Sequence, residues 1–185
     1  MSTPISLVGS GHMVDEVDRP LQRFPAAREA AAEVWLQREV GQIAGQTDAI
    51  RAFSSGANGG DILFLEACRH LSVEATIVLP FPPDVFVGTS VASAGGNWER
   101  RFRALWHDTP PSRREVMNLP VTAAAYTACN LRLLHLAREA GNVHLLALWD
   151  GQRGKEGGTA ELVREAEKLR ASITSADPLT LPPSN

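Results

Sequence analysis

The sequence predicts an α/β fold, a single Rossmann-like, doubly wound domain with a mainly parallel sheet and helices on both faces. Short apolar runs alternate with longer segments of helical periodicity along most of the chain. This alternation is typical of parallel strands joined by covering helices. A length of 185 residues suits one domain. Three of the apolar runs lead into glycine-rich segments, which indicates several loops at one edge of the sheet.

Five apolar runs are predicted to be strands, because each is short and bounded by turn residues. They cover residues 5–11, 49–56, 73–81, 115–119 and 142–151. Pro80, Pro82 and Pro83 stop the third run, since proline has no N–H to give to a sheet. The fifth run, NVHLLALWDG, is almost continuously apolar, as expected for a strand buried on both faces.

Five further segments have the spacing of apolar residues that is typical of helices. They cover residues 25–44, 60–71, 97–106, 123–140 and 159–172. Pro25 suits a first helical turn, and Gly141 suits a helix end. Residues 82–97 have no regular period and are expected to be irregular. The predicted domain is therefore 1–172, and the proline-rich residues 173–185 are expected to form a flexible tail or linker.

Composition excludes several classes of protein. The net charge of −3 argues against broad capture of nucleic acid or an anionic membrane. Cys68 and Cys129 each lie in a helical pattern, which favours free, buried thiols in a reducing compartment. No apolar stretch approaches the ~20 residues of a membrane span, so a cytoplasmic location is expected. The histidines are scattered, and no metal site or cofactor is predicted.

Glycine-rich segments follow three of the predicted strands, with the sequences VGSGHMVD, SSGANGGD and WDGQRGKEGGTAE. In doubly wound folds the ligand crevice lies at the carboxyl ends of the strands, and helix N-termini there suit phosphate. A nucleotide-like ligand is therefore expected. The first loop is not a dinucleotide fingerprint, because Val14 stands where the third glycine of G-x-G-x-x-G belongs. No P-loop sequence occurs either.

These segments, together with VLPF, NWERRFRAL and AYTACNLRLL, resemble the SLOG superfamily, which is named for the Smf DNA-processing and Lonely-guy proteins. The likeness runs from about Ile5 to Arg170 and is closest to the sensor-type branch. It implies a Rossmann-like fold that binds nucleotides or nucleotide-derived sugars at the strand ends. Some members cleave an N-glycosidic bond, and others only sense ligands such as ADP-ribose-type signals. Dimers are common in this superfamily.

The Lonely-guy enzymes carry a P-G-G-x-G-T-x-x-E signature, and the matching stretch here is KEGGTAEL. Gly157, Gly158 and Thr159 are retained, but the proline and the spacing from threonine to glutamate are not. Glu161 follows Thr159 by two residues instead of three, which turns its side chain by about 100° on a helix. This departure weighs against hydrolysis and in favour of binding.

The candidate ligand-binding residues come mainly from the three glycine-rich loops. They are Gly9, Ser10, Gly11, His12, Ser55, Gly56, Ala57, Asp61, Phe81, Arg101, Asp150, Gly157, Gly158 and Thr159. If the chain is a hydrolase, Glu161 and Asp150 are its candidate catalytic residues.

Most of these candidates have a second interpretation. Thr159 can hold a phosphate together with Gly157 and Gly158, or it can simply cap a helix. Asp150 can accept hydrogen bonds from ribose hydroxyls or begin a turn, and Asp61 can do the same or stabilise a helix start. Arg101 can pair with a phosphate or face solvent.

His12 can donate to a ligand or bond to its own loop, and Phe81 can stack on a base or pack in the core. Tyr126 and Asn130 share a helix face and match family positions, and they can also form a buried pair that supports the sheet.

The leading hypothesis is a sensor or regulatory module that binds a nucleotide or nucleotide-derived molecule, such as a nucleoside monophosphate or an ADP-ribose-like compound. It would pass a signal to an effector domain, a partner protein or a second copy of the chain. The alternative is a Lonely-guy-like phosphoribohydrolase. Binding of single-stranded DNA is disfavoured by the acidic charge.

Overall fold

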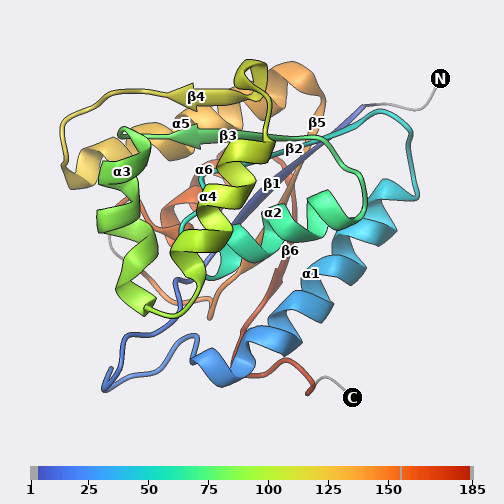
Figure 1. The fold of residues 1–185 in the computed structure, drawn as a ribbon. Coiled ribbons are helices and arrows are strands. Elements are labelled where there is room, and N and C mark those ends of the chain that lie inside the picture. The colour runs from blue at the N-terminus through green and yellow to red at the C-terminus, as the bar shows by residue number, and fades with distance from the viewer. Residues whose placement is uncertain (1–3, 155, 184–185) are drawn as a thin grey trace.

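A computed structural model of the chain, describing residues 4–154 and 156–183, confirms the α/β class. Its centre is a six-stranded sheet in the order β4-β3-β2-β1-β5-β6, in which every pairing is parallel (Figure 1). The strands are β1 (Ile5–Gly11), β2 (Ile50–Ser54), β3 (Ala75–Leu79), β4 (Arg114–Val116), β5 (Asn142–Leu148) and β6 (Ser172–Ala176).

Helices cover both faces of this sheet, as the sequence predicts. They are α1 (Glu29–Ala44), α2 (Gly60–His70), α3 (Pro83–Phe86), α4 (Trp98–Asp108), α5 (Ala123–Ala140) and α6 (Thr159–Lys168). In Figure 1, α1, α2 and α4 lie in front of the strands, while α5 and α6 lie behind them. Short helical turns η2 (Val87–Val91) and η3 (Ala92–Ala94) follow α3. The segment expected to be irregular is therefore mostly helical.

The core consists of two apolar layers, one on each face of the sheet. Leu7 and Val8 are neighbours on β1 and both are fully buried, but they belong to different layers. Leu7 packs with the front layer, which includes Phe64 of α2, and Val8 packs with Leu133 of α5. Successive side chains of a strand point to opposite faces, so the uninterrupted apolar run of β1 is explained by burial on both sides.

The end of the chain differs from the prediction. Ser172–Ala176, assigned mostly to a tail by the sequence, forms the edge strand β6 and pairs with β5. Beyond it, the backbone carbonyls of Pro178 and Leu181 accept hydrogen bonds from Arg28, which precedes α1. The strand was missed because its sequence, SITSA, is short and largely polar. The final residues 184–185 lie outside the described chain.

The connections of β1 and β5 diverge, although these two strands are neighbours. The chain leaves β1 toward α1 on the front face and leaves β5 toward α6 on the other face. Such a switch point opens a crevice at the carboxyl ends of the two strands. In Figure 1 this edge of the sheet lies at the lower left, where the loop that follows β1 lies below α4. In the described residues no helix has the length and apolar character needed to cross a membrane.

Two glycines bring the end of β1 against the start of α2. A Cβ atom added to Gly60 would lie 2.5 Å from Cα of Gly11, and one added to Gly11 would lie 2.8 Å from Cα of Gly60. The N–H of Gly60 donates to the carbonyl of His12 at 3.1 Å. Because the crowded atoms are backbone, no side-chain rotation can make room for a methyl group.

We therefore expect Gly60→Ala to lower the free energy of unfolding by about 1–3 kcal/mol, the usual cost of an overpacked site. Urea denaturation measures this change. Gly88→Ala is the matched control, because an added Cβ there meets nothing within 4 Å; its stability should stay within about 0.5 kcal/mol of the wild type. Equal stabilities for the two variants would contradict this account of the packing.

Candidate functional site

A cavity of about 510 Å³ opens at the carboxyl edge of the sheet, over the switch point. All three glycine-rich loops contribute to its wall, joined by α5 and by the segment from α3 to η3. The described residues that line it are 10–14, Glu16, Arg19, Arg23, Ser55, Ala57, Asp61, Pro80, Phe86, Thr89, Ser90, Ser93, Tyr126, Cys129, Asn130, Gly154 and 156–160. The structure thus brings the three loops together around one space.

The predicted site residues divide into two groups. Those that line the cavity are Ser10, Gly11, His12, Ser55, Ala57, Asp61, Gly157, Gly158 and Thr159. Those that are not among the described lining residues are Gly9, Gly56, Phe81, Arg101, Asp150 and Glu161. For the second group the structure shows other contacts, which are described below.

Gly9 and Phe81 are packed in the core. A Cβ on Gly9 would lie 2.1 Å from the ring of Phe64, so this glycine makes room for an aromatic side chain of α2. Phe81 is fully buried, with its ring edge-on to Tyr126 at 5.3 Å between centroids. Gly56 adopts a φ of 87°, and a Cβ atom added there would lie 3.4 Å from Leu65 and from Phe102. These contacts explain the three residues without a ligand.

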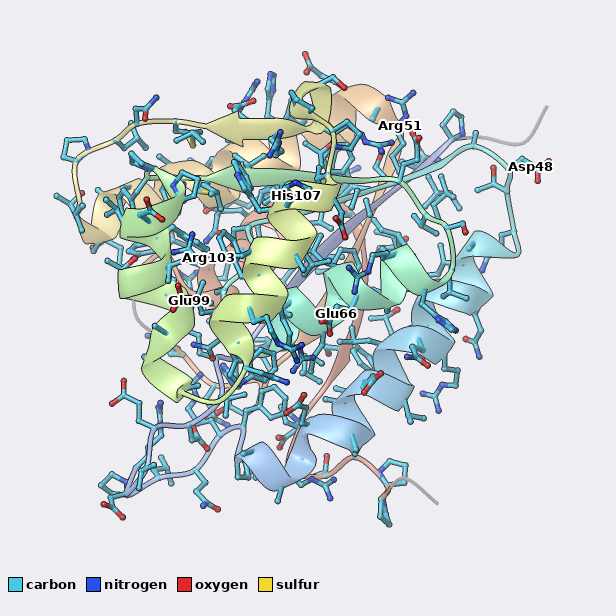
Figure 2. The ribbon with its side chains drawn as sticks, in the orientation of Figure 1. Asp48, Arg51, Glu66, Glu99, Arg103 and His107 are labelled. Carbon is cyan, nitrogen blue, oxygen red and sulfur yellow. The ribbon has the colours of Figure 1, made fainter. Side chains whose placement is uncertain are left out.

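Arg101 joins three helices. Its guanidinium donates to both carboxylate oxygens of Glu66, at 2.9 and 2.6 Å, and to Glu29 of α1 at 2.5 Å. It also lies 4.1 Å above the ring of Trp98. Figure 2 shows Glu66 on α2, one of these partners, and on the neighbouring α4 it shows Arg103 beside Glu99. Of the described residues that line the cavity, none is an arginine of α4.

Arg19 and Arg23 line the cavity instead, from the connection between β1 and α1. Sequence analysis missed them because this connection has no periodicity, and the only signal is the spacing of two arginines in DRPLQR. Arg19 donates from Nε to the carbonyl of Leu21 at 2.9 Å. Arg23 donates from Nε to Asp150 at 3.0 Å.

His12 and Asp150 meet across the switch point. Nε2 of His12 lies 3.1 Å from Oδ1 of Asp150 and accepts from its backbone N–H at 3.1 Å. Burial, assisted by the charge of Arg23, lowers the pKa of His12, so the ring is neutral at pH 7. Burial alone would raise the pKa of Asp150, but bonds from Arg23 and the N–H of Gln152 outweigh it and hold that pKa at about 2. Asp150 is therefore a carboxylate at every physiological pH.

Asp61 connects the first two loops. Its carboxylate accepts the N–H of Gly11 at 3.0 Å, the hydroxyl of Ser55 at 2.7 Å and the N–H of Ala57 at 3.3 Å. The residue is only 5% exposed. Burial raises its pKa to about 6, although the hydrogen bonds act in the opposite direction. Asp61 therefore organises the wall of the cavity through its neighbours' backbone.

The first turn of α6 forms another part of the wall. Gly158, Thr159 and Ala160 line the cavity there, and the first N–H groups of a helix favour anions. The hydroxyls of Ser10 and Thr159 lie 3.1 Å apart, so β1 and α6 are in direct contact. Glu161 accepts the N–H of Gly157 at 2.6 Å and the hydroxyl of Thr127 at 3.1 Å. This carboxylate holds the turn before α6.

Uncharged polar groups form the third side. The hydroxyls of Ser90 and Tyr126 lie 3.1 Å apart, and Asn130 donates to the carbonyl of Gly157 at 2.9 Å. Asn58, fully buried, accepts the N–H of Val14 and donates to the carbonyl of Ser90. Asn58 is a further residue that sequence analysis missed, although it lies inside the glycine-rich segment SSGANGGD.

The fold and the site together define a doubly wound α/β domain with a polar crevice at its switch point. Among solved structures, the chain is similar to DNA processing protein A (DprA) from Streptococcus pneumoniae, with a TM-score of 0.50 and 13% sequence identity. The comparison covers 94% of this chain and 50% of DprA, so the chain spans about half the length of that protein. This likeness supports the Rossmann-like fold.

No family model matches the sequence, and no curated protein does. Within residues 4–154 and 156–183, no group of three or more His, Cys, Asp or Glu side chains is arranged to hold a metal ion.

The raised pKa of Asp61 has a consequence for stability. Its ordinary value is 3.8 and its value in the fold is about 6, so between these values the folded chain holds a proton that the unfolded chain has lost. The free energy of unfolding then falls as pH rises through this window. Compared with Asp61→Asn, which does not titrate, the wild type should lose roughly 2 kcal/mol between pH 4 and 6.5. Urea denaturation of both proteins at several pH values measures the difference, and a constant difference would contradict this effect.

The contacts of Glu161 predict a structural effect for its replacement. Glu161→Ala removes two hydrogen bonds to the turn before α6 and should lower the free energy of unfolding by about 1–2 kcal/mol. Glu165→Ala is the control, since Glu165 pairs with the exposed Lys168 and its replacement should change stability by less than about 0.5 kcal/mol. Unchanged stability of Glu161→Ala would show that these bonds are unimportant and would return the carboxylate to the candidates for catalysis.

Proposed function

We propose that the cavity binds a nucleotide or nucleotide-derived ligand, a nucleoside monophosphate or an ADP-ribose-like molecule, and that the chain is a sensor-type member of the SLOG superfamily. The observation that carries this proposal is that one cavity is lined both by groups that suit an anion and by neutral polar groups. The first turn of α6 and Arg23 suit a phosphate. The hydroxyls of Ser90 and Tyr126, which line the same cavity, suit a neutral polar group.

Size and position support the same proposal. A volume of about 510 Å³ lies within the range of roughly 300–1,000 Å³ that is usual for small-molecule sites. The switch point of a doubly wound sheet is where such folds bind ligands. The superfamily suggested by the sequence is named in part for DNA-processing proteins, and the similar solved structure is a DNA processing protein.

A sensing role is favoured over hydrolysis by what the carboxylates already contact. Glu161 holds the turn before α6, and Asp150 is paired with Arg23. Each would have to leave these partners to stabilise a sugar cation or activate water. A binding experiment should therefore also test for cleavage of the N-glycosidic bond, by following release of the free base.

Gly158 allows a sharp test of binding. It is the N-cap of α6, with extended backbone angles of −86° and 178° that any residue adopts. An aspartate there should stabilise the helix start while placing a negative charge in the proposed phosphate site. Gly158→Asp should keep or raise the melting temperature, yet weaken binding of AMP and ADP-ribose by at least about tenfold.

Isothermal titration calorimetry measures the affinities, and liquid chromatography of the same samples detects released adenine. Gly158→Asn is the matched control, because it has the same shape without the charge and should retain more of the affinity. Failure of wild-type protein to bind any of AMP, ADP-ribose and ribose 5-phosphate would refute the proposal. Release of adenine by the wild type would replace the sensor with the hydrolase.

A further inference from the structure

Arg23 lies close to the segment that leads into α6. A Cβ atom placed on Gly154 would lie 4.0 Å from Nη2 of Arg23 and 3.6 Å from Cβ of Ala160. Gly154 therefore lies between the guanidinium and the helix start. An anion bound at the helix N-terminus would have this guanidinium at its side.

The backbone that carries Arg23 is held firmly. Oδ2 of Asp15 accepts the N–H groups of Arg23 and Phe24, at 2.8 and 2.9 Å, and the N–H of Asp15 donates to the carbonyl of Phe24 at 2.8 Å. Phe24 is fully buried in the core. The side chain of Arg23 is thus presented from a fixed base, and its direction depends on rotations about its own bonds.

Asp150 is the group that Arg23 contacts in this structure. The Nε–Oδ2 distance is 3.0 Å, whereas the second contact, from Nη2 to Oδ1, is 3.5 Å and too long to be strong. A guanidinium has five N–H donors, and this pair uses one of them well. The side chains are 22% and 16% exposed, so solvent and a ligand can reach the pair.

We infer that Arg23 is the residue that binds the anionic group of the ligand, and that Asp150 is an internal competitor which holds Arg23 when the cavity is empty. This inference rests on the proposed binding of a phosphate-bearing ligand. It adds which residue binds the phosphate and predicts that Asp150 lowers the affinity. A phosphate oxygen would share or replace the carboxylate of Asp150 at the guanidinium, because both are oxyanions that suit its fork geometry. Asp150 therefore opposes binding, which is the reverse of a role in holding ribose hydroxyls or in catalysis.

Removing the charge of Asp150 tests the inference. Asp150→Asn keeps the shape of the side chain and frees Arg23, so it should tighten binding of AMP and of inorganic pyrophosphate by roughly three- to fivefold, the effect of losing one partly exposed competing ion pair. Arg23→Ala should weaken both by roughly tenfold or more. In the Arg23→Ala background, Asp150→Asn should no longer tighten binding, since the residue it competes for is absent.

Calorimetry with AMP and with pyrophosphate distinguishes the outcomes. Asp108→Asn is the matched control, because Asp108 pairs with Arg69 away from the cavity, and it should leave both affinities unchanged. Unchanged or weaker binding by Asp150→Asn, with AMP still bound by the wild type, overturns the inference and leaves the proposed function standing. Binding of pyrophosphate but not of AMP, tightened by Asp150→Asn, supports the inference and removes the nucleoside monophosphate from the proposed ligands.

If neither probe binds the wild type, the inference falls, and the proposed function falls with it when ADP-ribose and ribose 5-phosphate also fail to bind. If Asp150→Asn does not fold, Arg23→Gln decides the matter, because it leaves Asp150 in place and removes the cation. Loss of affinity for AMP in Arg23→Gln, with an unchanged melting temperature, supports the inference. Retained affinity overturns it.

Discussion

The close approach of Gly11 and Gly60 is the constraint on which the rest of the site depends. It brings the backbone of β1 and the start of α2 within the distance at which neither residue can carry a Cβ atom. Only at this distance can Asp61, in the first turn of α2, accept the N–H of Gly11 while it also accepts from Ser55 and Ala57. The buried carboxylate is satisfied because the two glycines let the backbones meet.

The cavity therefore has walls of two kinds. The wall around Gly11 and Asp61 is held by backbone packing and cannot move without separating a strand from a helix. The loop that carries Arg23 is held through side chains, among them Asp15 and Asn58. Differences in ligand occupancy should be absorbed by rotation of the Arg23 side chain that this loop carries, since that rotation disrupts no element of the sheet.

The sequence predicted the architecture well, because the strands buried on both faces carry an unmistakable apolar pattern, as in β1 and β5. It missed β6, whose five residues are mostly polar and are recognisable as a strand only once β5 offers an edge to pair with. Three loops were correctly expected to meet, since parallel strands place their carboxyl ends at one edge. The sequence could not show which arginine lines the cavity, because that depends on tertiary partners. Arg101 is paired with Glu66 and Glu29, and no local sequence pattern predicts this pairing.

Two carboxylates at this edge of the sheet differ in how their charge is compensated. Asp61 is compensated by the dipoles of N–H and hydroxyl groups, and burial raises its pKa to about 6. Asp150 is compensated by the full charge of Arg23, and its pKa is held at about 2 despite partial burial. Dipoles that belong to packed backbone cannot turn toward a ligand, because doing so would part Gly11 from Gly60. A guanidinium can turn by rotating its own bonds. Of the two carboxylates, only Asp150 can therefore give up its partner to an anion of the ligand. Because the wall at Gly11 and Gly60 is rigid, this exchange of partners moves only the side chain of Arg23.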